Sequence, residues 1–201
     1  DTTNSLETYV LVKVVNDRYA DIQLGSKFSV GLTSTGKVWT WGSNTFGELG
    51  INSTDAYSDE PKEVSGLNNI RDIGVGDYHV VAVNENGEVY AWGLNNNGQL
   101  GDGTTDNKKV PTKINGLSNI VKVDAYKYIT TALDSNGNLY AWGEGYGSTP
   151  QKIYENILDM SENVLIPSDR RIMRLDGSVI HNLRNVVKAS SNETTILAVL
   201  I

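Results

Sequence analysis

The chain has 201 residues, of which 39% are hydrophobic and 20% are charged, and its formal net charge is −7 at pH 7. This balance is typical of a folded globular protein, whereas the acidic charge disfavours a nucleic-acid-binding protein, which normally carries a basic face. Cysteine is absent, which excludes disulfides, thiolate nucleophiles and cysteine metal ligands. No apolar run approaches the roughly 18–20 residues that cross a bilayer, so we predict no membrane insertion.

A repeat of about fifty residues organises the chain, and such a period is typical of solenoids and propellers. Its clearest mark is a Trp-Gly pair that recurs at Trp41-Gly42, Trp92-Gly93 and Trp142-Gly143. The apolar segments that precede these pairs align as well, at 30–32, 81–83 and 131–133. We predict three good repeats at 16–67, 68–117 and 118–156, then a degenerate repeat at 157–184 and a half repeat at 185–201.

The local pattern in each repeat predicts short strands joined by tight turns. β-Branched and aromatic residues lie on either side of Asn-Gly or Asp-Gly dipeptides, which favour two-residue hairpin turns because both residues tolerate a positive φ. These dipeptides are Asn86-Gly87, Asn136-Gly137 and Asp176-Gly177, and Thr35-Gly36 takes the same place in the first repeat. The prolines that follow the Trp-Gly pairs are expected to fall between strands. They are Pro61, Pro111 and Pro150.

Four short strands in about fifty residues, repeated along the chain, predict an all-β fold, a β-propeller with four-stranded antiparallel blades. We expect about four blades, in a single partial or small propeller over 1–201. The small residues Gly31, Ala82 and Ala132 are expected on the inner strand of each blade, where the sheets crowd the axis. The tryptophans of the Trp-Gly pairs have the bulk to fill the gaps between adjacent blades, and the following glycine lets the backbone turn closely.

Residues 87–105, which read GEVYAWGLNNNGQLGDGTT, resemble the regulator of chromosome condensation repeat family, as does His79 after Gly76. The resemblance implies a propeller that usually closes seven blades, and it implies a structural role for His79. Because this chain supplies about four blades, another copy of the chain, or a separate chain or missing part of the protein, would complete the ring. A small closed ring of four to five blades is the third alternative. We favour completion by other polypeptide, because both ends of the chain interrupt a repeat.

Candidate catalytic and metal-binding residues are sparse. The two histidines, His79 and His181, fall in different repeats, and the chain has neither a nucleophile elbow nor a phosphate-binding loop. Residues 102–107 include two aspartates but lack the acidic residue that closes a calcium loop. We therefore predict no enzyme activity, no cofactor and no metal. An enzyme that uses carboxylates on one propeller face is the least favoured hypothesis.

A propeller without catalytic residues usually serves as a rigid platform whose loops bind a protein partner. Aromatic residues at the edges of the polar loops are the candidate contacts, namely Phe46, Tyr57, Tyr78, Tyr126 and Tyr146. The first hypothesis is therefore a non-enzymatic protein-binding module. The resemblance implies the alternative, a guanine-nucleotide exchange factor for a small GTPase. The acidic charge and the Asn-rich turns resemble those of bacterial, secreted or surface-associated members of this family, and the resemblance implies a bacterial protein that is extracellular or at the cell surface.

Overall fold

The computed structural model describes residues 17–181, 185–191 and 196–200. The first sheet contains β1 (Tyr19–Leu24), β2 (Phe28–Thr33), β3 (Val38–Ser43) and β4 (Tyr57–Glu63). The second contains β5 (Ile70–Val75), β6 (His79–Asn84), β7 (Val89–Gly93) and β8 (Lys108–Lys113). The third contains β9 (Ile120–Tyr126), β10 (Ile129–Asp134), β11 (Leu139–Gly143) and β12 (Gly147–Tyr154). The fourth contains β13 (Ile157–Ser161), β14 (Val164–Pro167), β15 (Ile172–Arg174) and β16 (Val179–His181). The last pairs β17 (Val186–Ser191) with β18 (Ile196–Leu200).

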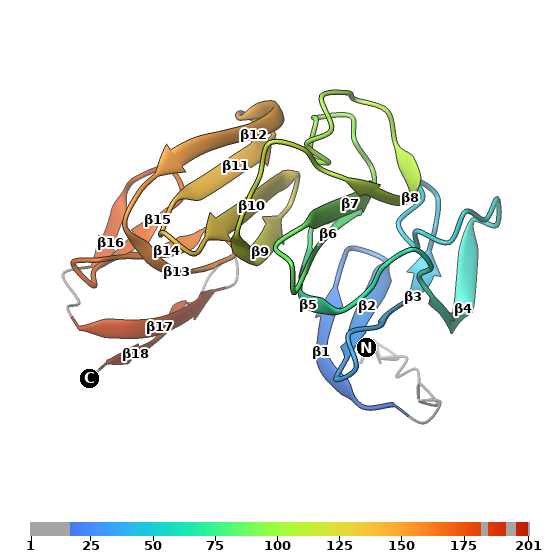
Figure 1. The fold of residues 1–201 in the computed structure, drawn as a ribbon, viewed down its shortest axis with the longest axis horizontal. Helices are drawn as coiled ribbons and strands as arrows, with labels where there is room; N and C mark the ends of the chain where they lie inside the picture. Colours follow the sequence, from blue (N-terminus) through green and yellow to red (C-terminus); the bar gives the residue numbers. More distant parts are fainter. Residues whose placement is uncertain (1–16, 182–184, 192–195, 201) are drawn as a thin grey trace, which may run out of the picture.

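These five sheets are consecutive blades, which we number 1 to 5 in chain order. Neighbouring strands pair antiparallel, and the order within each four-stranded sheet is the order in the chain. Figure 1 shows the blades following one another around an arc, with blade 1 at one end and blade 5 at the other. The prediction of an all-β propeller with about four four-stranded antiparallel blades is therefore confirmed.

The first strand of each blade is the innermost strand. β1 packs against β5, β5 against β9, and β13 against β17, whereas β4 and β8 lie on the outside of the arc (Figure 1). The prediction that Gly31, Ala82 and Ala132 occupy the inner strand is wrong, because they lie in the second strands β2, β6 and β10. At Gly31 a larger residue would not fit, because the ring of Tyr19 fills the space that a Cβ would enter.

Burial is greatest in the second strand of a blade and least in its outer strand. Every residue of β6 is buried, because blades 1 and 3 cover its two faces, while β4 and β8 contain no buried residue. The prolines expected between strands lie instead inside the outermost strands, Pro61 in β4, Pro111 in β8 and Pro150 in β12. Each lies where the pairing register of that strand shifts. A missing N–H is tolerated there, because an edge strand has only one neighbour.

The turns between the second and third strands are longer than the sequence predicted. Gly87 has a φ of 76° and Gly137 a φ of 81°, but neither Asn86 nor Asn136 has a positive φ. In blade 2 the Gly87 N–H donates to the Asn84 carbonyl, and the Asn84 N–H donates to the Glu88 carbonyl. The connection is therefore a three-residue loop, in which a tight turn is followed by a left-handed glycine. The two-residue prediction was wrong because only the glycine needs the left-handed conformation.

Adjacent blades share apolar clusters that are built the same way at successive interfaces. Leu49 of blade 1 meets Ile73 of blade 2 in the first cluster. Leu100 of blade 2 meets Val123 of blade 3 in the second. In both, the third-strand tryptophan of the later blade completes the cluster. Each sheet therefore obtains its core from the next sheet, not from within itself.

Hydrogen bonds from two indoles also join the blades. The Trp92 Nε1–H donates to the Glu48 carbonyl at 2.9 Å, and the Trp142 Nε1–H donates to the Gln99 carbonyl at 2.9 Å. The Gln99 carbonyl also accepts the Thr130 hydroxyl at 2.7 Å. Because all these groups are buried, a lost donor would not be replaced by water.

Because the Gln99 carbonyl accepts a second donor, two matched substitutions are expected to have unequal effects. Trp92→Phe leaves the Glu48 carbonyl without its indole donor, whereas Trp142→Phe leaves the Gln99 carbonyl bonded to Thr130. We expect Trp92→Phe to lower the free energy of unfolding by about 1 kcal/mol more than Trp142→Phe does. Urea denaturation of the two variants measures the difference, and equal losses would contradict the assignment.

Candidate functional site

Several turns and loops gather at one end of the propeller, which we call the loop end. It carries the turns β1–β2, β5–β6 and β9–β10, and it carries the longer loops β3–β4 and β7–β8. Backbone hydrogen bonds tie the three turns together across the blades. The Ser26 N–H donates to the Asp77 carbonyl at 2.9 Å, and the Asp77 N–H donates to the Lys127 carbonyl at 3.0 Å. The loop end is therefore one continuous surface with little freedom between blades.

Three aromatic rings from successive blades form a row on this surface, which we call the aromatic ladder. Phe46 comes from the β3–β4 loop, Tyr78 from the β5–β6 turn and Tyr128 from the β9–β10 turn. The rings of Phe46 and Tyr78 meet edge to face, with centroids 5.5 Å apart. Those of Tyr78 and Tyr128 are stacked at 6.4 Å. All three side chains are partly exposed, so the ladder presents rigid aromatic area to solvent.

Negative charges surround one end of the ladder. Desolvation raises the pKa of the Tyr128 hydroxyl, and the nearby Asp77, Tyr78 and Glu144 raise it further. The hydroxyl therefore stays protonated at neutral pH and can donate a hydrogen bond. The ladder thus combines apolar rings with a phenol donor and two carboxylates.

The structure brings together two of the five predicted contact residues, Phe46 and Tyr78. Tyr57 lies at the start of the outer strand β4 and is 60% exposed. Tyr126 ends β9, where the Lys127 ammonium lies 5.2 Å from its ring centroid. Tyr146 packs against the apolar cluster that blades 3 and 4 share. A role for these residues in partner binding stays a prediction.

Tyr128 belongs to the ladder but was absent from the predicted contacts. It stands directly before β10, as Tyr78 stands directly before β6, so the repeat alignment contained the signal. In blade 1 the equivalent residue is Lys27, which interrupts the aromatic pattern. Phe46 takes the place of a third ring by reaching in from a different loop. Sequence alignment alone could not show that substitution in space.

His79 lies fully buried between blades 2 and 3. Its Nε2 is 2.8 Å from the Thr130 hydroxyl, which itself donates to the Gln99 carbonyl at 2.7 Å. The imidazole must therefore donate from Nε2, and it has no other hydrogen-bond partner in the described part of the chain. Burial lowers the pKa of His79 to about 3. A neutral, inaccessible imidazole of this kind joins two blades and is unsuited to proton transfer with a substrate. The His181 side chain lies outside the described residues.

Two carboxylates on the innermost strands also form hydrogen bonds between blades. Asp72 accepts the Val123 N–H at 2.9 Å, and Asp124 accepts the Glu162 N–H at 2.7 Å. Burial raises the pKa of Asp72 to about 6 and raises the pKa of Asp124 as well. Neither carboxylate has a nucleophile or a histidine beside it among its described contacts. Their positions serve the stacking of blades.

The aspartates of the β7–β8 loop surround an amide group. The Asn95 Nδ2 donates to the Asp102 carboxylate at 3.2 Å and to the carbonyls of Thr104 and Asp106, both at 3.1 Å. The Lys108 ammonium balances the charge of Asp102 at 3.1 Å. The oxygen atoms that resemble calcium ligands in the sequence thus fix the loop through Asn95. Across the described ranges, no group of three His, Asp or Glu side chains could hold a metal ion.

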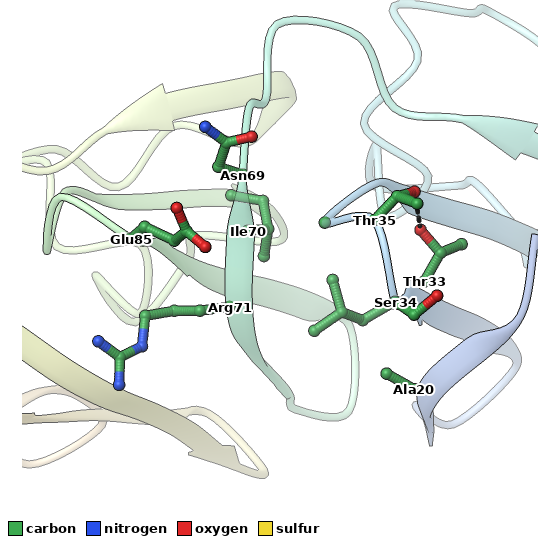
Figure 2. Close-up of a pocket in the computed structure, with 10 residues that line it drawn as sticks. Ala20, Thr33, Ser34, Thr35, Asn69, Ile70, Arg71 and Glu85 are labelled. Atoms are coloured by element: carbon green, nitrogen blue, oxygen red, sulfur yellow. Dashed lines mark hydrogen bonds between the residues drawn. The ribbon is translucent and has the colours of Figure 1, made fainter.

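A shallow polar pocket lies at the opposite end, between blades 1 and 2 (Figure 2). The Thr33 and Thr35 hydroxyls in its wall are 3.0 Å apart and bonded to each other, and Thr35 also donates to Asp17. In Figure 2 the Arg71 guanidinium points away from these hydroxyls. The polar groups of the pocket do not converge on one point, so it lacks the donor set of a catalytic site.

Two family models match this chain. The model of the regulator of chromosome condensation (RCC1) repeat matches residues 35–83 and 86–133, and a second model of this repeat matches 19–48 and 70–99. Together the matches span more than half of the chain. This chain belongs to the RCC1 repeat family. The matched residues cover blades 1 and 2. In blade 3 they cover β9 and all but the last residue of β10.

Relatives in the RCC1 repeat family resemble part of this chain closely. The human E3 ubiquitin-protein ligase HERC2 is 45% identical over 92 residues, which are 45% of this chain and 2% of HERC2. The ultraviolet-B receptor UVR8 of Arabidopsis thaliana is 41% identical over 93 residues, which are 45% of this chain and 21% of UVR8. The chain therefore matches only a minor share of the length of these relatives.

Solved structures that include yeast RCC1 show the same fold. Human WBSCR16 superposes with a TM-score of 0.68 at 19% identity, over 78% of this chain and 46% of that structure. Yeast RCC1 (Prp20), solved with Kap60, gives a TM-score of 0.62 at 24% identity, over 69% of this chain and 37% of the other. RCC1 repeat propellers are generally non-catalytic binding or exchange modules. In the described ranges, this member has no helix long and apolar enough to span a membrane.

Two of the buried titrating groups of this RCC1 repeat protein, His79 and Asp72, predict opposing pH effects. The pKa of His79 is depressed from 6.5 to about 3, so its contribution to stability is present above pH 6.5 and is lost as the pH falls toward 3. The pKa of Asp72 is raised from 3.8 to about 6, so stability falls as the pH rises through that range. Each slope approaches about 1.4 kcal/mol per pH unit where the ranges overlap.

Single variants should separate the two slopes. For His79→Phe, chosen because Phe28 holds this place in blade 1, we expect stability relative to wild type to decline from pH 4 to pH 6. For Asp72→Asn, relative stability should rise over the same interval. Urea denaturation at each pH measures both curves. Parallel curves for wild type and both variants would refute the two assignments.

Proposed function

We propose that this chain is a non-enzymatic protein-interaction module whose partner binds the loop end, with the aromatic ladder at the centre of the contact. The observation that carries the proposal is the ladder itself. Three rings from three different segments meet on a surface, in an order that no single strand imposes. Aromatic side chains of this kind supply large contact areas with few rotatable bonds, and they dominate the energetics of protein interfaces.

The surroundings of the ladder suit a protein partner more than a small molecule. The hydrogen bonds from Ser26 to Asp77 and from Asp77 to Lys127 hold the turns before any partner arrives, which lowers the entropy lost on binding. Asp77 and Glu144 provide a polar rim beside the rings. The loop end is an exposed platform, as expected for a surface that accepts a large partner.

Related structures give independent support for protein binding by this fold. Yeast RCC1 was solved with Kap60 bound, and a further structure of the Saccharomyces cerevisiae protein is described with its binding properties to Gsp1p and histones. These statements concern the yeast protein, which shares only 24% identity with this chain. For the present chain we therefore propose a protein partner without naming it. Guanine-nucleotide exchange on a small GTPase is the alternative.

An extracellular or cell-surface location in a bacterium is a separate proposal. The acidic net charge and the Asn-rich loops support it. Fractionation of the native source with an antibody to this chain tests it. Recovery in the cytosolic fraction alone would reject it.

The ladder can be tested by matched alanine substitutions. Tyr78→Ala removes the central ring, and Tyr57→Ala removes an exposed tyrosine outside the ladder, which the sequence predicted as a contact but which this proposal places outside the binding surface. We expect Tyr78→Ala to weaken the saturable binding of a partner captured from native extracts by about tenfold or more in affinity. Tyr57→Ala should leave this affinity unchanged. Thermal melts of both variants check that the propeller still folds. Equal retention by both variants would reject the loop end as the binding surface.

The same proteins separate the two candidate functions. Release of a fluorescent GDP analogue from a panel of small GTPases measures exchange activity directly. Release accelerated by wild type and lost in Tyr78→Ala would favour the exchange factor. Partner capture without any acceleration would favour the interaction module.

A further inference from the structure

Asn-Gly pairs recur along this chain, and such a pair can rearrange without an enzyme. The backbone nitrogen of the glycine attacks the asparagine Cγ and loses its proton, the Cγ–Nδ2 bond breaks, and the amide nitrogen leaves as ammonia. Solvent water then opens the cyclic succinimide at one of its two carbonyl groups, which leaves either aspartate or isoaspartate. Glycine favours the attack because it has no Cβ to hinder it. The pairs are Asn86-Gly87, Asn97-Gly98, Asn115-Gly116 and Asn136-Gly137.

Three of these pairs lie in tight turns that hold the attacking nitrogen. In each, the glycine N–H donates to the carbonyl three residues earlier, at 3.0 Å for Gly87, 2.9 Å for Gly98 and 3.1 Å for Gly137. The space beside these glycines is filled as well. A Cβ on Gly98 would lie 2.6 Å from the Ser148 Cα, and one on Gly87 would lie 2.9 Å from the Ile120 nitrogen. Attack by these nitrogens therefore requires the turn to open first.

Asn115-Gly116 has a different setting, in the connection between β8 and β9. Within the described chain, the Gly116 N–H has no hydrogen-bond acceptor. Nothing lies within 4 Å of the place that a Cβ on Gly116 would take. Both residues of the pair are exposed. The attacking nitrogen is therefore available in the folded protein, and water reaches the ring that forms.

The connection also tolerates a change in its backbone. The Ile114 N–H, just before the pair, is fixed by the Val89 carbonyl at 2.9 Å. Residues 115–118 form no backbone hydrogen bond with any part of the chain that the structure describes. Leu117 then packs against the apolar cluster that blades 2 and 3 share. A modification at Asn115 thus breaks no backbone hydrogen bond of the propeller.

We propose that Asn115 is a modification site, at which the folded protein forms aspartate and isoaspartate faster than at its three other Asn-Gly pairs. The reaction replaces a neutral amide with a carboxylate, and isoaspartate lengthens the backbone by one CH2 group. The new charge falls in the pocket that Asn115 lines together with Lys108 and Lys113. The site follows β8, whose other end joins the loop end, so the inference does not rest on the proposed function.

Blade 1 offers a matched position at Ser65-Gly66, which follows β4 as Asn115-Gly116 follows β8. Gly66 has a φ of 82° and Gly116 a φ of 83°. The Gly66 N–H also has no acceptor among the described residues, and the space where its Cβ would lie is open. Both pairs are exposed. The two sites therefore differ in the side chain that would be attacked, serine in one and asparagine in the other.

The rates at the four pairs test the proposal directly. The full chain is incubated at neutral pH, and peptide mass spectrometry measures deamidation at each pair. Isoaspartate is measured with an isoaspartyl methyltransferase and labelled S-adenosylmethionine. We expect Asn115 to react about tenfold faster than each of the other three asparagines, because their glycine nitrogens must first lose a hydrogen bond. In guanidinium chloride the four rates should become similar, because the turns no longer exist.

Two results would overturn the proposal. One is a rate at Asn115 in the folded chain that is no higher than the rate at any of the other three pairs. The other is an advantage of Asn115 that persists unchanged in guanidinium chloride, because the neighbouring sequence, and not the fold, would then set the rate.

Reciprocal substitutions at the matched positions test the geometry. Asn115→Ser should remove most of the isoaspartate that the folded chain forms. Ser65→Asn should create a second site that reacts at a rate similar to that of Asn115, because the two glycines have the same conformation and the same open space. Thermal melts check that both variants fold. A folded Ser65→Asn variant that deamidates at residue 65 as slowly as at Asn86 would contradict the proposal.

Discussion

Every sheet in this protein depends on its neighbours for a hydrophobic core. A four-stranded sheet of this size has two apolar faces, and β6 is buried along its whole length only because blades 1 and 3 cover it. The contacts between blades are specific as well as apolar. Indole N–H groups, the His79 imidazole and the Asp72 carboxylate each form a hydrogen bond across an interface. Stacking with fixed polar joints sets the angle and order of the blades, and the other features of the molecule follow from it.

The loop end inherits its rigidity from this stacking. The turns of three blades lie side by side because the strands beneath them are stacked, and backbone hydrogen bonds then join the turns directly. Phe46, Tyr78 and Tyr128 come from different blades, so their contact exists only in the assembled propeller. A binding surface built in this way would be lost if one interface between blades opened.

The polar groups buried between blades have perturbed pKa values. His79 is kept neutral and Asp72 holds its proton more tightly than usual, both because burial disfavours charge. Similar perturbations are common at catalytic sites. Here the His79 imidazole and the Asp72 carboxylate each form a hydrogen bond to the next blade, so their perturbed pKa values reflect a structural role. A titratable side chain that is buried where no substrate can reach it is not evidence of catalysis.

The sequence by itself determined the periodicity, and with it the all-β propeller of four-stranded antiparallel blades. The Trp-Gly pairs and the turn glycines recur at a fixed spacing, because each blade must repeat the same strands and turns. It could not determine the radial order of the strands, since the small residues of β2, β6 and β10 fit an inner position equally well. It also missed the place of the edge prolines, which sit at register shifts that leave no mark in composition. Only the tertiary structure joined Tyr128 to Phe46 and Tyr78, because their contact depends on the stacking of three blades. The reason is physical: motifs that are alike in sequence have different environments, because each packs against residues that are distant along the chain.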